Sequence, residues 1–90
     1  MLMIWDERKR ESNLRKHRMD FPDARDRFEW ASALVEAAKP GPDGRPRFLA
    51  VGFLDGRLVS LVFALVGSEA ISAISLRRAS RSERNRYDEA

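Results

Sequence analysis

The stretch RFLAVGFLDGRLVSLVFALV, residues 47–66, sets the fold of this chain. Two apolar runs rich in β-branched and aromatic residues are separated only by Asp55-Gly56. This dipeptide favours the positive φ angles of a type I′ turn, which joins antiparallel strands tightly. We therefore predict a β-hairpin formed by residues 47–54 and 57–66.

The sequence on either side of the hairpin predicts more strands. A turn at residues 67–69 leads into an apolar run at 70–76, and a short apolar run begins the chain at 2–5. The alanine-rich run 33–38 suits a strand, although it would also extend the preceding helix. Residues 39–46 contain three of the four prolines and form a loop. Because the strand at 57–66 is apolar on both faces, we place it at the centre of an antiparallel sheet with helices over one side.

Two helices are predicted before the sheet. Asp6 can cap a helix over residues 7–18, which is almost without apolar residues. Pro22 stands in the first turn of a second helix, where its missing N–H costs nothing. The apolar face of this second helix follows helical spacing at Phe21, Ala24, Phe28 and Ala31.

A third helix is predicted at the end of the chain. Ser80 and Glu83 form a capping box, which indicates a helix over residues 81–89. Only Tyr87 and Ala90 are available for burial there, so we expect this helix to dock weakly or to wait for a partner.

Length and composition limit the function. Ninety residues make one domain, residues 1–90, with 43% hydrophobic and 34% charged residues. The fold class is α+β: two N-terminal helices, an antiparallel sheet of three to four strands and a C-terminal helix. No apolar run approaches the roughly 18 residues of a membrane span, and the first residues do not follow the order of a secretory signal. We expect a cytoplasmic protein without membrane contact.

Positive charge is concentrated near both ends of the sequence. Residues 8–18 and 77–86 hold eleven of the seventeen lysines and arginines, and arginine outnumbers lysine fourteen to three. Guanidinium groups bind phosphate through a two-pronged fork. If the two stretches meet, they form a surface for nucleic acid. Two solvated helix faces would explain the same pattern.

One stripe of the first helix carries groups that could do chemistry. Lys9, Asn13, Lys16 and His17 fall within about 100° on an α-helix, and His17 is the only histidine. Imidazole can donate and accept protons near neutral pH, although polar stripes on short helices are often only solvent-facing. With no cysteine, one histidine and no paired carboxylates, we expect neither a metal site nor a cofactor.

Arg77 and Arg78 end the last predicted strand. Strand alternation sends their side chains to opposite faces, so one of them can reach the surface of the histidine stripe. The sequence does not say which one.

These residues resemble the BrnT family of toxins. The resemblance rests on three segments: Trp5-Asp6-x-x-Lys9-x-x-x-Asn13-x-x-Lys16-His17-x-x-x-Phe21-x-x-Ala24, a strand with Arg47-Phe48 and Gly52, and Ile74-Ser75-Leu76-Arg77-Arg78-Ala79-Ser80-x-x-Glu83-Arg84-x-x-Tyr87. It implies a RelE-like fold and an endoribonuclease that cleaves RNA, blocks translation and is neutralised by a BrnA-like antitoxin. Operator DNA would be bound only through that antitoxin.

The resemblance also directs attention to particular residues. The Lys16-His17 and Arg77-Arg78 pairs match the family's most recognisable polar positions, and we predict that Lys16, His17, Arg77 and Arg78 form the catalytic group. We also expect RNA contacts from Lys9, Asn13, Arg47, Arg81 and Arg84. RNA cleavage without metal needs a proton acceptor, a proton donor and cations around the phosphate. Glu36 and Glu83 are alternative bases, although the capping box is expected to occupy Glu83.

Two other functions compete with the ribonuclease. A non-catalytic nucleic-acid-binding module would use the same arginines only to hold phosphates, but the sequence lacks the array of aromatic residues that single-strand binders use for stacking. An interaction protein would instead fold its polar helices on a partner.

Overall fold

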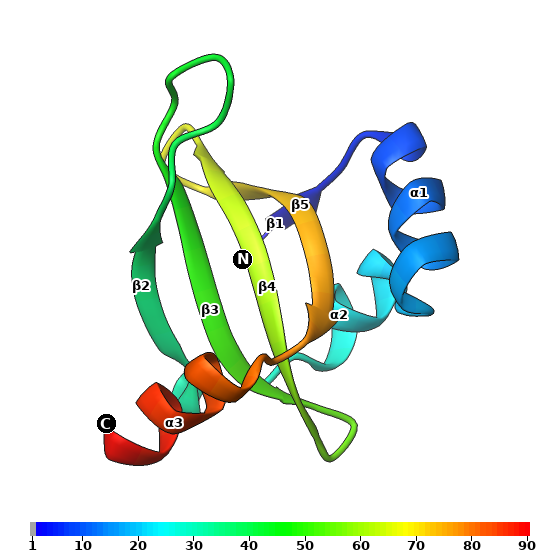
Figure 1. The fold of residues 1–90 in the computed structure, drawn as a ribbon. Helices are drawn as coiled ribbons and strands as arrows, with labels where there is room; N and C mark the ends of the chain where they lie inside the picture. Colours follow the sequence, from blue (N-terminus) through cyan, green and yellow to red (C-terminus); the bar gives the residue numbers. More distant parts are fainter. Residues whose placement is uncertain (1) are drawn as a thin grey trace.

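The computed structural model describes residues 2–90, which form one five-stranded sheet and three α-helices (Figure 1). In chain order the elements are β1 (Leu2–Ile4), α1 (Glu7–His17), α2 (Phe21–Arg27), a 3₁₀ turn (Trp30–Ser32), β2 (Leu34–Ala38), β3 (Arg47–Leu54), β4 (Arg57–Val66), β5 (Ala70–Arg78) and α3 (Arg81–Glu89). The predicted α+β class is confirmed, and the ambiguous run at 33–38 is a strand.

The sheet has the strand order β1-β5-β4-β3-β2, with β4 at its centre as predicted. Strands β2 to β5 form an antiparallel meander of four. The remaining strand, β1, pairs in parallel with β5 over only three residues, from Leu2 opposite Ala70 to Ile4 opposite Ser72. Beyond Ser72, β5 therefore continues without a strand on its outer side.

The β3–β4 hairpin confirms the turn predicted from Asp55-Gly56. Leu54 pairs with Arg57, which leaves a loop of two residues. Asp55 has a φ of 52° and Gly56 a φ of 80°, the two positive values that a type I′ turn requires.

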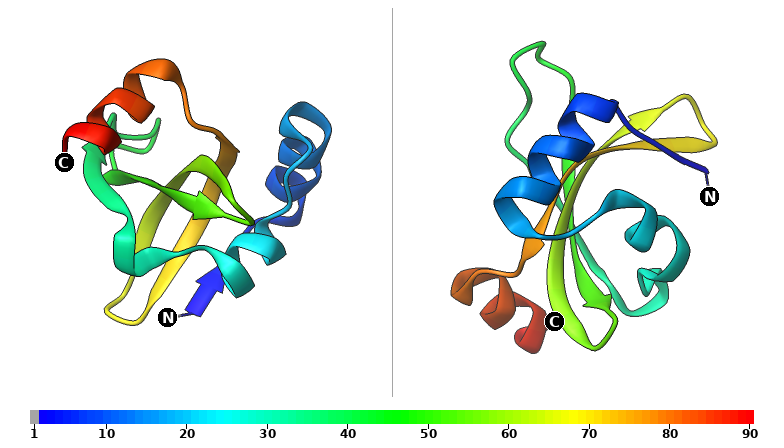
Figure 2. Two further views of the ribbon diagram at one scale, coloured as in Figure 1. Left: turned by 90° about the horizontal axis from the view of Figure 1, so that it is seen from below. Right: turned by 90° about the vertical axis from the view of Figure 1, so that its right-hand side faces the viewer.

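Helices cover both faces of the sheet, so the prediction that they lie over one side is wrong. Phe21 and Ala24 of α2 are buried in the larger core on one face. Tyr87 of α3 packs on the other face, where its ring meets Phe53 edge-on with centroids 5.7 Å apart. Figure 2 shows α2 and α3 on opposite sides of the sheet. The reason is that β3 and β4 are apolar on both faces, and each face needs a cover.

The second helix is shorter than its apolar spacing suggested. It ends at Arg27, and Phe28 is buried as its C-terminal cap residue. Ala31, expected on the same helical face, instead lies exposed in the 3₁₀ turn.

The first helix runs beside β5 (Figures 1 and 2). At its start, the Asp6 carboxylate accepts a hydrogen bond of 2.8 Å from the backbone N–H of Arg8, as the capping argument predicted. The helix ends at His17, one residue before the predicted end, because Arg18 turns to a φ of 58°. Within residues 2–90, no helix has the length and apolar character to span a membrane.

Candidate active site

A cleft lies between α1 and the outer edge of β5. Its volume is about 220 Å³, and its lining residues come from these two elements: Lys9, Ser12, Asn13, Lys16, His17, Ile74 and Ser75. All four residues of the predicted polar stripe therefore meet at one site. Helical spacing puts them on one face of α1, and the packing of α1 on β5 turns that face toward the strand.

Asn13 fastens the helix to the strand. Its Oδ1 accepts a hydrogen bond of 2.9 Å from the Leu76 N–H, and its Nδ2 donates to the Leu76 carbonyl at 2.9 Å. The second Nδ2 proton goes to the Met19 carbonyl at 3.0 Å. The Asn13 amide thus satisfies the backbone N–H and carbonyl of Leu76, as a neighbouring strand would, at a point on β5 where β1 has ended. Both N–H donors of this buried side chain are engaged within the fold, which favours a structural role over the predicted RNA contact.

The basic side chains at the cleft are those of Lys9, Lys16 and His17, and all three are exposed. None of them forms a salt bridge or a side-chain hydrogen bond with another of residues 2–90. Lys16 and His17 stand in the last turn of α1, where the helix dipole favours positive charge. The cleft is therefore a positively charged hollow that holds the chain's only histidine.

Arg10, on the neighbouring side of α1, behaves differently. It forms a two-pronged ion pair with Asp20, at 2.7 and 3.0 Å. These hydrogen bonds lower the pKa of Asp20 and leave Arg10 neutralised. The basic groups at the cleft thus differ from Arg10, because no carboxylate lines the cleft with them.

Arg77 and Arg78 point to opposite sides of β5, as strand alternation predicted. Arg77 pairs in register with Ser60, and its guanidinium donates two hydrogen bonds to Glu83, at 2.7 and 2.8 Å. Neither arginine lines the cleft. Arg77 is nevertheless two residues beyond Ser75 on the same strand, so both side chains share one face of the sheet.

Glu83 is the buried carboxylate of the structure, with only 6% of its surface exposed. Besides Arg77, it accepts hydrogen bonds from the Ser60 hydroxyl at 2.7 Å and the Ser80 N–H at 2.8 Å. The Arg77 hydrogen bonds, aided by Ser60, lower the pKa of Glu83 to about 2 despite its burial. These contacts anchor α3 to the sheet, whereas the sequence had suggested weak docking.

The alternative bases are both engaged elsewhere. Glu83 is held as described, with the predicted capping box present, and Glu36 pairs with Arg86 at 3.1 Å. In the part of the chain that the structure describes, no three His, Cys, Asp or Glu side chains gather in a way that could hold a metal ion. The titratable groups that line the cleft are two amines and an imidazole, and the hydroxyls of Ser12 and Ser75 lie beside them.

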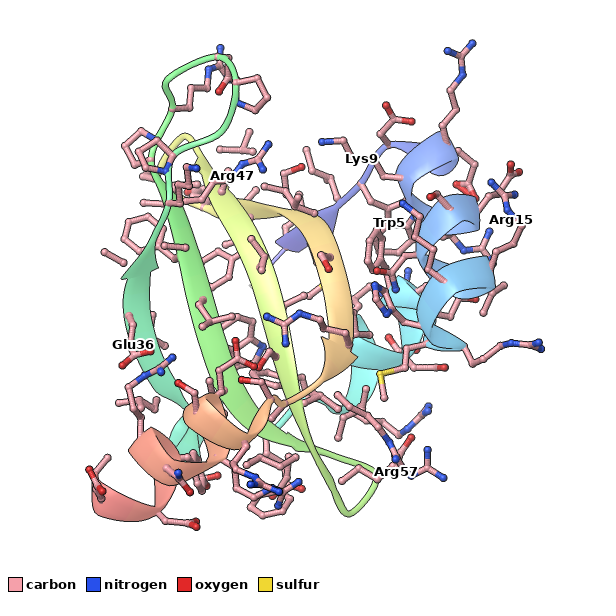
Figure 3. All side chains as sticks on the ribbon, viewed as in Figure 1. Trp5, Lys9, Arg15, Glu36, Arg47 and Arg57 are labelled. Carbon is pink, nitrogen blue, oxygen red and sulfur yellow. The ribbon has the colours of Figure 1, made fainter. Side chains whose placement is uncertain are left out.

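The remaining predicted RNA contacts lie outside the cleft. A Cβ atom on Gly41 would come within 2.6 Å of Arg47 Nε, so Arg47 packs against the loop before β3. Arg81 and Arg84 are exposed on α3. Figure 3 shows Lys9 at the start of α1, Arg47 near one end of the sheet and Arg57 near the hairpin at the other end.

Sequence reasoning missed Ser60, Ser75 and the partnership of Glu83 with Arg77. One signal was present for Ser60, because it is a lone polar residue within the apolar run of β4. A buried hydroxyl in such a run needs a hydrogen-bond partner, but the sequence does not identify that partner.

Comparison with known proteins identifies the family. The family model described as "Ribonuclease toxin, BrnT, of type II toxin-antitoxin system" matches residues 5–83. The crystal structure of the Brucella abortus ribonuclease toxin BrnT matches with a TM-score of 0.66 and 36% sequence identity, over 90% of this chain and 100% of that one. No curated protein matches the chain significantly. The match over most of the chain confirms the resemblance seen in the sequence: the chain belongs to the BrnT family of ribonuclease toxins of type II toxin–antitoxin systems.

Proposed function

We propose that the chain is an endoribonuclease that cleaves RNA at the α1–β5 cleft without a metal ion. The observation that carries this proposal is the group of Lys9, Lys16 and His17, which surrounds one cleft with no carboxylate to neutralise it. In the cytoplasm, cleavage would block translation, and a BrnA-like antitoxin would neutralise the toxin. Operator DNA would be reached only through that antitoxin.

The reaction uses the RNA's own 2′-hydroxyl as nucleophile. The 2′-oxygen attacks the adjacent phosphorus and loses its proton, the bond from phosphorus to the 5′-oxygen breaks, and that oxygen gains a proton. The products are a 2′,3′-cyclic phosphate and a free 5′-hydroxyl. His17 transfers a proton, and Lys9 and Lys16 stabilise the extra negative charge on the pentavalent phosphate.

Arg77 supplies a further cation on the same face. Three of its five N–H donors are occupied: both on Nη1, which bond the Arg78 carbonyl and Glu83, and one on Nη2, which bonds Glu83. The Nε–H and the second Nη2–H lie along the other edge of the planar group. That edge can bind two phosphate oxygens. Glu83 and Ser60 then act as positioning residues that orient this edge.

The chemistry is tested with purified protein and a labelled RNA in the presence of EDTA. We expect cleavage to continue and the products to carry 2′,3′-cyclic or 3′-phosphate ends. His17→Ala should lower the single-turnover rate by about 10²–10⁴-fold, the usual loss when a general acid or base is removed, with little change in RNA affinity.

The control is Arg15→Ala, because the Arg15 side chain is exposed and points away from the sheet (Figure 3). Cleavage abolished by EDTA and restored by Mg²⁺ would contradict the metal-free mechanism. A full rate in folded His17→Ala protein would assign proton transfer to Lys9 or Lys16. RNA binding without any cleavage would favour a non-catalytic binding module.

A further inference from the structure

Strand β5 contains a β-bulge beside the cleft. Ala73 pairs with Phe63 and Ser75 pairs with Val62, which leaves Ile74 without a partner on β4. One extra residue in a strand interrupts the alternation of its side chains between the two faces of the sheet. The residues after the bulge therefore point to the faces opposite to those that strict alternation would give them.

The buried residues of β5 show this change of face. Ile71, Ala73 and Leu76 all lie in the larger core, although the first two are two positions apart and the third follows after three. With strict alternation, Ser75 and Arg77 would share the core side with Ala73, and Leu76 would lie on the opposite face. The bulge thus keeps both polar side chains out of the apolar core.

The bulge lies where the outer edge of β5 is open. Strand β1 pairs only as far as Ser72, and the Asn13 amide holds the edge again at Leu76. Between these two positions no other strand of residues 2–90 pairs with the outer edge, and Ile74 and Ser75 both line the cleft there. Two consecutive residues of a regular strand would point to opposite faces, so the bulge explains why both reach the cleft.

The hydroxyl of Ser75 is left unused by the fold. It forms no hydrogen bond with any other of residues 2–90, whereas the Ser60 hydroxyl donates to Glu83 at 2.7 Å. The Ser75 side chain is half-buried and lines the cleft from β5, while Lys16 and His17 line it from α1. A hydroxyl has one O–H to donate, and here that donor is free to bind a ligand in the cleft.

We propose that Ser75 is a catalytic residue that binds the phosphate at which RNA is cleaved. Its Oγ–H donates a hydrogen bond to a non-bridging oxygen of that phosphate and transfers no proton. This oxygen gains negative charge in the pentavalent state, so the hydrogen bond strengthens as the reaction proceeds. The inference rests on the proposed ribonuclease function and adds to it a phosphate-binding group from the strand, opposite the basic groups of α1.

The test compares Ser75→Thr with Ser75→Val, because the two side chains have nearly the same shape and only threonine keeps the hydroxyl. Both are β-branched and suit a strand. Ser75→Thr should keep most of the single-turnover cleavage rate, and Ser75→Val should lose roughly ten- to a hundred-fold, the effect of removing one hydrogen bond to a charged group. Ser72→Ala should keep the full rate, because Ser72 precedes the bulge on the same strand and does not line the cleft.

A phosphorothioate at the cleaved linkage locates the contact. Sulfur accepts hydrogen bonds more weakly than oxygen, so the two diastereomers report separately on the two non-bridging oxygens. Ser75→Val should change the ratio of their cleavage rates several-fold, because it removes a contact to one oxygen only. Equal slowing of both diastereomers would overturn the proposal, since a merely structural role of Ser75 gives that result. Equal rates in the threonine and valine variants would overturn it as well.

Binding separates this proposal from the proposed function. A 2′-O-methyl RNA lacks the attacking hydroxyl and stays intact, and fluorescence anisotropy measures its affinity. If ordinary RNA is not cleaved but Ser75→Val weakens this binding several-fold more than Ser72→Ala, the ribonuclease is refuted and Ser75 remains a phosphate-binding residue. If RNA is cleaved equally well by both Ser75 variants, only the role of Ser75 is refuted. If RNA is neither cleaved nor bound, both proposals are refuted.

Discussion

Arg77 gains its orientation from Glu83. An unattached arginine samples many conformations, and ordering it on RNA costs side-chain entropy. Here the two-pronged bond to a buried carboxylate holds the group before any ligand arrives. The pair carries little net charge, so Arg77 contributes directed N–H donors more than long-range attraction. Lys9 and Lys16, which have no such partner among residues 2–90, supply the attraction.

The lowered pKa of Glu83 predicts how the free energy of unfolding depends on pH. The pKa is about 2 in the folded chain, against an ordinary value of 4.5. The charged carboxylate therefore stabilises the fold fully above about pH 4.5, and this stabilisation is lost as the pH falls toward 2. Its size is on the order of 3 kcal/mol. Glu83→Gln should remove this part of the pH dependence, as measured by urea unfolding between pH 2 and 6.

Glu11→Gln is the control for that experiment, because Glu11 is exposed and forms no salt bridge within residues 2–90. Its unfolding profile should follow that of the unchanged chain. If the Glu83→Gln profile also matched that of the unchanged chain, the Glu83 carboxylate would not be the cause of this pH dependence.

Among the elements, α1 depends on one side chain for its position. The helix has almost no apolar residues, and Leu14 is 41% exposed. The hydrogen bonds of the Asn13 amide hold the helix against β5, a task that an apolar face performs in most helices. It also completes the pairing of β5 at Leu76, beyond the end of β1.

Asn13→Ala should therefore destabilise the fold by about 2–3 kcal/mol, because it leaves the N–H and carbonyl of Leu76 without partners. Urea unfolding measures this loss, and faster amide hydrogen exchange in α1 would locate it. Ser12→Ala, in the same cleft, should cost less than about 0.5 kcal/mol. Unchanged stability together with weaker RNA binding would restore the interpretation of Asn13 as an RNA contact.

Across the whole molecule, basic side chains of α1 gather at one edge of the sheet. The cleft that they line lies beside Ile74 and Ser75, in the middle of β5. Farther along the same strand, the Arg77–Glu83 pair joins the sheet to α3.

This arrangement predicts toxicity in a bacterial host. Induction of the chain should arrest growth and lower bulk translation, measured by incorporation of labelled amino acids, because RNA cleavage removes templates for translation. His17→Ala should relieve the arrest, and co-expression of an antitoxin partner should restore growth. Normal growth with verified folded protein would refute an active toxin while leaving the fold unaffected.

Features that depend on neighbouring residues could be predicted from the sequence. The Asp55-Gly56 turn, the Asp6 cap, the capping box at Ser80 and the polar stripe of α1 all arise within a few positions, where backbone preference and helical or strand spacing act directly. The family also followed from such local motifs.

Tertiary packing alone determines which distant groups meet. Asn13 and Leu76 are 63 positions apart, and Ser60 and Glu83 are 23 apart. Their contacts depend on strand order, register and the face to which each helix docks, and no local pattern encodes these. The fold therefore gives the buried amide of Asn13 partners on β5 and gives Arg77 a fixed orientation on Glu83, because burial leaves a polar group stable only where the fold brings it a partner.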